Sequence, residues 1–82
     1  MRTLYRIVDG KAEALEFVVP NDFEYIDVTF RDLKLKKNLI IACIIRHSKV
    51  IFPRGADCLE AGDTVIVVTS IESLRTLADI VE

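Results

Sequence analysis

Leu39-Ile40-Ile41-Ala42-Cys43-Ile44-Ile45 is the longest apolar run in the chain, and no polar residue interrupts it. A strand that is apolar at every position is typically covered on both faces. We therefore expect one face of this strand to pack on helices and the other to lie against a second subunit. The run is far too short to cross a membrane, which takes about 20 apolar residues.

The chain has 82 residues, enough for one domain, and 51% of them are hydrophobic. So high an apolar fraction in so small a chain favours a dimer. Eleven Lys and Arg stand against thirteen Asp and Glu, so the net charge of -2 argues against a nucleic-acid partner. Arg2, Arg6 and Asp9 interrupt any apolar signal-peptide core, which predicts a cytoplasmic domain.

Upstream of the apolar run, the sequence predicts a hairpin and a short helix. The hairpin strands are Leu4–Val8 and Ala14–Val19, joined at Asp9-Gly10, because glycine readily adopts the positive φ of a tight turn. The helix is expected over Asp27–Leu33, where apolar residues recur at helical spacing and Asp27 is a candidate N-cap. A basic connector then leads into the apolar strand.

Downstream, the predicted elements are a turn Arg46–Lys49, a strand Val50–Phe52, a turn Ala61-Gly62-Asp63, a strand Thr64–Thr69 and a helix Ile71–Val81. Pro53 lacks an N–H and suits the end of an edge strand. Ser70 is a candidate N-cap for the last helix. The order β-β-α-β-β-β-α predicts an α+β domain with a mainly antiparallel sheet and helices packed on it.

Catalytic chemistry finds little support in the sequence. His47 is the sole histidine and lies in a polar turn, and Cys43 lies inside the apolar run, where burial makes a thiol inert. The glycines at positions 10, 55 and 62 lie in separate turns, so neither a dinucleotide fingerprint nor a P-loop is present. Cys43 and Cys58 lack the spacing of a zinc site or a disulfide framework. We predict no catalytic residue and no metal site.

Two groups of charged residues are candidates for ligand binding, and each has a simpler interpretation. Lys36, Lys37 and Asn38 form a cationic loop that could attract a phosphate, as could Arg54, but solvated surface charge explains both. The acidic residues of the second group are Glu13, Glu16, Asp22 and Glu24. They could hold a hard cation only by converging on one point, and dispersed surface carboxylates are the favoured interpretation.

Four segments, taken in order, resemble the TrkA C-terminal domain family, also called RCK-C. They are Asp32–Leu35, Leu39–Arg46, Val50–Gly55 and Leu59–Val67. The family pattern combines a short helix, an apolar strand ending in Ala-Ile-x-Arg, an Ile-x-x-Pro-x-Gly element and a Gly-Asp pair before an apolar strand. The resemblance covers about residues 12–82. The chain departs from the pattern at Asp27, where members often have glycine, and in a short loop before the apolar strand.

The resemblance implies a non-catalytic regulatory domain that dimerises and controls potassium transport through a membrane channel or transporter subunit, at the inner face of the membrane. NAD is expected only on an adjacent Rossmann domain. The resemblance also implies a possible cyclic dinucleotide or divalent cation as ligand. Its site would lie near Lys36, Lys37, Asn38, Ile40, Pro53 and Arg54, and Gly10, Gly55, Gly62 and Asp63 would form structural turns.

Two other classes of function remain as alternatives. An assembly module would dimerise in the same way but bind no ligand. An enzyme would need a cleft with perturbed titrating groups around Cys43 or His47.

Overall fold

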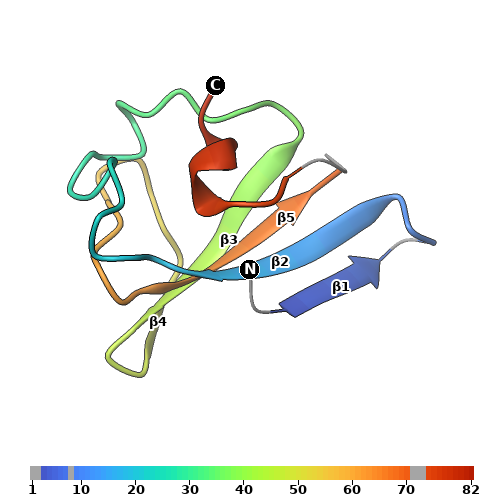
Figure 1. The fold of residues 1–82 in the computed structure, drawn as a ribbon, viewed down its shortest axis with the longest axis horizontal. Helices are drawn as coiled ribbons and strands as arrows, with labels where there is room; N and C mark the ends of the chain where they lie inside the picture. Colours follow the sequence, from blue (N-terminus) through green and yellow to red (C-terminus); the bar gives the residue numbers. More distant parts are fainter. Residues whose placement is uncertain (1–2, 8, 71–73) are drawn as a thin grey trace.

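The computed structural model of the chain describes residues 3–7, 9–70 and 74–82. Its strands are β1 (Thr3–Ile7), β2 (Ala12–Val18), β3 (Leu39–Arg46), β4 (Lys49–Ile51) and β5 (Thr64–Thr69). They form one antiparallel sheet in the order β1-β2-β5-β3-β4, so that β5 lies at its centre (Figure 1). The antiparallel sheet confirms that part of the predicted fold class.

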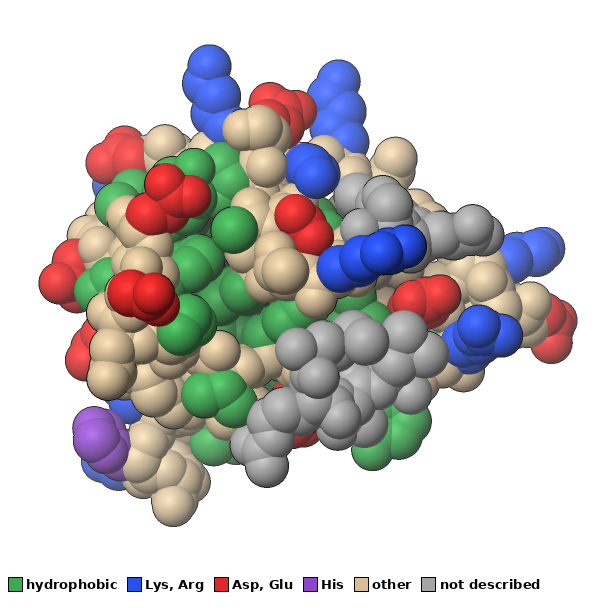
Figure 2. Space-filling model, viewed as in Figure 1, with side chains coloured by type: hydrophobic (Ala, Val, Ile, Leu, Met, Phe, Trp, Pro, Cys, Tyr) green, Lys and Arg blue, Asp and Glu red, His purple; other side chains and the backbone are tan. Residues whose placement is uncertain are grey.

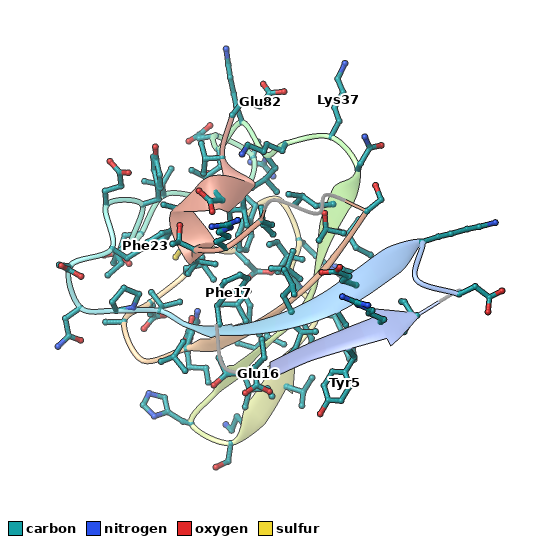
Figure 3. All side chains as sticks on the ribbon, turned by 45° about the vertical axis from the view of Figure 1, so that its right-hand side comes forward. Tyr5, Glu16, Phe17, Phe23, Lys37 and Glu82 are labelled. Atoms are coloured by element: carbon teal, nitrogen blue, oxygen red, sulfur yellow. The ribbon has the colours of Figure 1, made fainter. Side chains whose placement is uncertain are left out.

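The core lies on one face of this sheet, which we call the covered face. The loop that follows β2, the segment between β4 and β5, and a 3-10 helix, η1 (Leu77–Ile80), lie over this face (Figure 1). Phe17 and Phe23 point into the space between these covering segments and the sheet (Figure 3). The buried core comprises Leu15, Phe17, Val19, Phe23, Ile44, Leu59, Val65, Val67, Leu74, Leu77 and Ile80.

A bulge in β3 decides which of its side chains reach the core. The pairing of β3 with β5 shifts between Ile41 and Cys43, so Ile41 lies opposite Val67 and Ile44 opposite Val65. An extra residue in one strand reverses the alternation of faces at that point. Two isoleucines three positions apart therefore both face the core.

Ile40, Cys43 and Ile45 of β3 lie on the opposite face, which we call the open face. Ile40 is 61% exposed there and Ile45 is 37% exposed. The prediction that this strand is apolar on both sides is confirmed. The prediction that α-helices cover one side is wrong, because loops and the short η1 cover it. Coverage of the other side by a second subunit stays a prediction. Cys43, predicted to be buried, is only half-buried, because it too lies on the open face.

The turn after β3 is tighter than the predicted one. His47 and Ser48 have φ values of 50° and 65°, the two positive values of a type I′ hairpin turn. Arg46 and Lys49 therefore pair with each other as the last and first residues of their strands, and β4 ends at Ile51. Pro53 follows β4, which is an edge strand as predicted.

The predicted helix over Asp27–Leu33 is wrong, because the backbone bonds across to another segment. A helix needs each N–H to bond the carbonyl four residues back. Here the N–H of Asp27 donates to Leu59 O at 3.1 Å, and the N–H of Phe30 donates to Asp57 O at 2.9 Å. Asp27 has a left-handed φ of 64° and is not an N-cap.

The predicted helix over Ile71–Val81 is also wrong in its described part, and residues 71–73, where it would begin after Ser70, lie outside the described residues. From Leu74 onward only the short 3-10 helix forms. The C-terminal backbone instead pairs with residues 34–36, since Glu82 N donates to Lys34 O at 2.7 Å and Lys36 N donates to Ile80 O at 2.8 Å. This pairing requires an extended chain, which ends the helix early.

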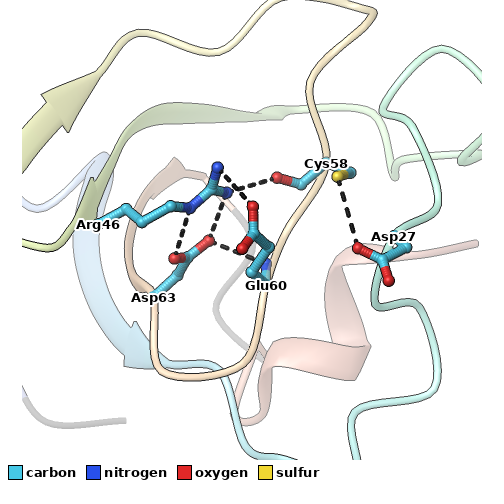
Figure 4. A network of polar contacts seen from close by, with 5 residues as sticks. All are labelled: Asp27, Arg46, Cys58, Glu60 and Asp63. Atoms are coloured by element: carbon cyan, nitrogen blue, oxygen red, sulfur yellow. Dashed lines mark hydrogen bonds and ion pairs between the residues drawn. The ribbon is translucent and has the colours of Figure 1, made fainter.

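Arg46 and Asp63 form the central polar contact of the fold (Figure 4). Arg46 Nε and Nη2 donate to the two carboxylate oxygens of Asp63 at 2.9 and 2.8 Å. Arg46 Nη2 also donates to Cys58 O, and Arg46 Nη1 lies 2.8 Å from a carboxylate oxygen of Glu60. Asp63 is 1% exposed and also accepts a hydrogen bond from Glu60 N. Arg46 thus ties the end of β3 to the turn that begins β5.

Gly62 makes this turn possible. Its φ of 87° lies in the left-handed region, where a side chain is strained. Gly62 N donates to Val19 O at 2.9 Å, and Val19 N donates to Asp63 O at 2.8 Å. The turn therefore also fixes the end of β2, and the prediction of a structural Gly62-Asp63 turn is confirmed.

Burial raises the pKa of the Asp63 carboxyl, but the hydrogen bonds from Arg46 and Glu60 and the charge of Arg46 outweigh burial, so the pKa falls below its ordinary value. The side-chain hydrogen bond with Asp63 in turn raises the pKa of Arg46. The pair is therefore ionised throughout the physiological range.

Asp63→Asn removes the charge that compensates Arg46, and we expect it to lower the free energy of unfolding by about 2–4 kcal/mol. Glu60→Gln is the matched control, because the Glu60 side chain is 49% exposed and an exposed ion pair contributes roughly 0–1 kcal/mol. Urea unfolding at pH 7 measures both. Equal losses for the two variants would show that Asp63 has no special role.

Stability should also depend on pH through Asp63. The pKa of Asp63 is lower in the folded protein than in the unfolded chain. The stabilisation that ionised Asp63 provides is therefore complete well above the unfolded pKa, and it is lost as pH falls through that value towards the folded pKa. The free energy of unfolding should thus decrease from about pH 5 downward. The slope should be shallower in Asp63→Asn. A slope identical in both proteins would assign the acid sensitivity to other carboxyls.

Candidate ligand-binding site

An apolar pocket of about 260 Å³ lies where β3 meets the segment after β4. We call it the Pro53 pocket. Its lining residues are Phe30, Leu35, Leu39, Ile40, Ile41, Pro53, Arg54 and Gly55. Most of this lining is apolar, with one cationic side chain among it, a combination typical of small-molecule sites.

Backbone hydrogen bonds hold the two walls of the Pro53 pocket together. Arg31 N donates to Gly55 O at 2.9 Å, which fastens the loop before β3 to the segment after β4. Arg54 N donates to a carboxylate oxygen of Asp57 at 2.7 Å, which fixes the turn that carries Arg54. Gly55 is a turn residue as predicted, and the Arg31 side chain lies against it. The same bonds that replace the predicted helix therefore build the pocket.

A second pocket, of about 350 Å³, adjoins the first and shares Leu39 and Ile40 with it. We call it the Asn38 pocket. Asn38 has a left-handed φ of 68°, and its carbonyl accepts hydrogen bonds from Ser70 N at 3.0 Å and Thr69 Oγ1 at 3.1 Å. The end of β5 thus holds the loop that precedes β3 in place.

The structure brings together four of the six predicted site residues. Ile40, Pro53 and Arg54 line the Pro53 pocket, and Asn38 lines the adjoining one together with Ile40. Lys36 and Lys37 are not among the described residues that line either pocket. Lys36 is tied by its backbone to the C-terminal segment, and Lys37 points away from the sheet (Figure 3).

Sequence reasoning missed most of the apolar lining. Phe30 was assigned to the buried face of a helix, and Leu35 to a polar connector. Both side chains are only partly buried and pack at the edge of the core. Apolar residues beside a basic loop are a sequence signal that could have pointed to a pocket there. Only the pairing of distant segments places Phe30 and Leu35 in the lining of one pocket.

Charge is unevenly distributed around the molecule. Acidic side chains gather on the left of Figure 2, over the loop that follows β2, whereas Lys and Arg side chains project at the top. The Arg54 guanidinium is in no ion pair within residues 3–7, 9–70 and 74–82. It is therefore available to bind an anion at the Pro53 pocket.

The other candidate chemistries do not assemble in the described part of the chain. No group of three or more His, Cys, Asp or Glu that could hold a metal ion is found among the described residues, the acidic residues of β2 and its following loop included. Burial, followed by the charge of Asp27, raises the pKa of the Cys58 thiol, which disfavours the nucleophilic thiolate. His47 lies exposed in the turn after β3, as predicted.

The open face of the sheet is the other conspicuous surface. The seven large hydrophobic side chains described as exposed are Tyr5, Ile7, Val18, Ile40, Ile45, Val50 and Phe52. Strand register places the first six on the open face, and Phe52 follows β4 two residues after Val50. Tyr5 projects from the side of the sheet opposite to Phe17 (Figure 3). Glu16 and Thr64 also lie on this face, but its exposed side chains are mostly apolar, and an apolar surface of this kind marks an interaction site.

No described helix is long and apolar enough to span a membrane. A small antiparallel sheet with a part-apolar pocket and an apolar open face is typical of a binding module. Residues 14–82 match the TrkA-C domain, and the chain belongs to this family, whose members are regulatory domains and not enzymes.

Similar proteins agree with this assignment. A Trk system potassium uptake protein TrkA homologue of Archaeoglobus fulgidus is 35% identical over 87% of the chain and 16% of its own length. Homologue 1 of Methanosarcina mazei is 29% identical over 88% of the chain and 18% of its own length. The chain thus spans less than a fifth of the length of these curated relatives.

A solved structure described as an RCK domain with cda has the same fold. It is 29% identical in sequence, with a TM-score of 0.61 over 72% of the present chain and 81% of its own. The predicted membership in the TrkA-C, or RCK-C, family is confirmed by these matches.

Proposed function

We propose that this chain is a ligand-sensing dimerisation domain of a Trk-type potassium uptake system. The observation that carries the proposal is the position of Ile40, which lines both pockets and is also exposed on the open face. A ligand seated at Ile40 touches the surface that a second copy would cover. Ligand binding and subunit association are therefore coupled at one side chain.

The ligand we propose is a cyclic dinucleotide, which the similar RCK domain with cda supports. Each pocket has an apolar floor suited to a base, and Arg54 offers a charge-assisted hydrogen bond to a phosphate. The Pro53 pocket, at about 260 Å³, is smaller than the roughly 300–1,000 Å³ of a complete small-molecule site. Two copies would thus each contribute half of the site.

Regulation would follow from a shift in population. A ligand that contacts two copies stabilises the arrangement in which both half-sites meet, by its difference in affinity for the two arrangements. The sheet is a rigid body, so a change at Ile40 reorients whatever is attached to the domain. The attached parts would be a nucleotide-binding domain and, on the cytoplasmic side, a membrane potassium channel or transporter subunit.

Cyclic di-AMP should bind the chain with a stoichiometry of one ligand to two chains, as measured by isothermal titration calorimetry. Arg54→Ala should weaken binding about tenfold or more, because a hydrogen bond to a charged group contributes about 1.5–3 kcal/mol. Arg75→Ala is the matched control, since Arg75 lines neither of the two pockets. AMP, Mg²⁺, Mn²⁺ and Ca²⁺ complete the panel.

Absence of binding by every compound, with a dimer still present, would refute the sensing function and favour the assembly module without a ligand. If a divalent cation releases heat on titration and no nucleotide does, the ligand is a metal ion and not a cyclic dinucleotide.

The chain should sediment at twice its mass of 9.3 kDa at high concentration and dissociate on dilution. Ile45→Lys places a charge on the open face and should raise the dimer dissociation constant at least tenfold, because an unpaired charge at an interface is costly. Lys49→Ala, at an exposed position outside this face, should leave it unchanged. A parent chain that stays monomeric at millimolar concentration would refute the dimer.

A further inference from the structure

The hairpin that β1 forms with β2 lies mostly outside the region that defines the family. The family match begins at residue 14, whereas β1 spans Thr3–Ile7 and β2 begins at Ala12. Without β1, β2 would be an edge strand of the sheet. β1 therefore lies outside the matched residues, and its effect on the surface can be read from the register.

Strand register aligns one side chain of β1 with the residue that links pocket and open face. Tyr5 lies opposite Ala14, Ala14 opposite Val68, and Val68 opposite Ile40. These four residues form one row across four adjacent strands, on the open face. With strands about 4.8 Å apart, Tyr5 lies roughly 14 Å from Ile40 along the row.

Two side chains of β1 that face this way, Tyr5 and Ile7, are large, apolar and uncovered. Tyr5 is 62% exposed and Ile7 is 39% exposed. Ala12 and Ala14 beside them are small, so the Tyr5 ring stands clear of its neighbours on β2. β1 also extends the open face from four strands to five, about a quarter more in width.

We propose that β1 is part of the surface through which two copies of this chain associate, with Tyr5 as an anchor residue. This inference rests on the dimer of the proposed function. Aromatic side chains with a polar tip are enriched among the residues that dominate interface affinity. A stable interface buries about 800 Å² per partner, so a sheet of this size needs its full width.

The composition of the open face favours a second copy as the occupant over an anionic partner. The described charged side chain of this face is the half-buried Glu16 on β2, and its described residues include no Lys or Arg, so an anionic lipid surface or a nucleic acid has no complementary group to bind. Two such faces can pack on each other as the layers of a sandwich, about 10 Å apart. Such a contact leaves one described charged side chain per copy, Glu16, to be accommodated among apolar neighbours.

Sedimentation equilibrium of the parent chain and four variants tests the proposal. Tyr5→Lys should raise the dimer dissociation constant at least tenfold, and Tyr5→Thr, which preserves strand propensity, at least threefold. Arg6→Ala is the matched control, since Arg6 pairs with Glu13 on the other side of the same strand, and should change the constant less than twofold. Ile45→Lys tests the open face independently of β1.

The outcomes separate the two claims. A dimer broken by Ile45→Lys but unaffected by both Tyr5 variants would overturn the role of β1 and leave the proposed function intact. A parent chain that is monomeric throughout would refute the dimer itself. Circular dichroism and the unfolding midpoint of each variant confirm that the sheet is retained, and an effect of Arg6→Ala equal to that of Tyr5→Lys would assign the change to strand stability instead.

Discussion

The partly buried ion pair between Arg46 and Asp63 is the contact on which the arrangement of this domain depends. Arg46 ends β3, and Asp63 precedes β5, so their two hydrogen bonds fix the two strands that form the centre of the core. Gly62 extends the same constraint to β2. An ion pair in an apolar setting tolerates little displacement, because either charge alone would be costly to bury. This constraint sets the strand register. The register in turn decides how the side chains are divided between the two faces of the sheet.

That division explains why an apolar pocket and an apolar sheet face meet at one residue. The bulge in β3 turns Ile41 and Ile44 towards the core and leaves Ile40 outside. The covered face is closed by loops held through backbone hydrogen bonds, whereas the open face has only its own side chains. A surface of this kind is stable in water when another apolar surface covers it. Ligand and partner are therefore expected at adjoining positions.

Local pattern was a good guide to the strands and a poor one to the helices. The strand Thr64–Thr69 and the Asp9-Gly10 turn are decided by neighbours in sequence, and both were predicted correctly. The spacing of apolar residues around Phe30 fits two structures equally well: a helix, and a loop whose apolar side chains reach the core. The choice depends on whether its N–H groups find a better partner elsewhere, and residues 55–59 supply one.

The sequence by itself determined the apolar strands, the turns that require glycine and the family of the chain, and four of the six ligand-binding residues predicted from it line the pockets. Only the tertiary structure decided that Arg46 and Asp63 are partners, that residues 27–33 are not helical, and that Lys37 points away from the site. The reason is physical: strand patterns and turns depend on steric properties of adjacent residues, which the sequence contains. Which carbonyl an N–H bonds, and which carboxylate compensates a buried cation, depends on segments brought together only by folding.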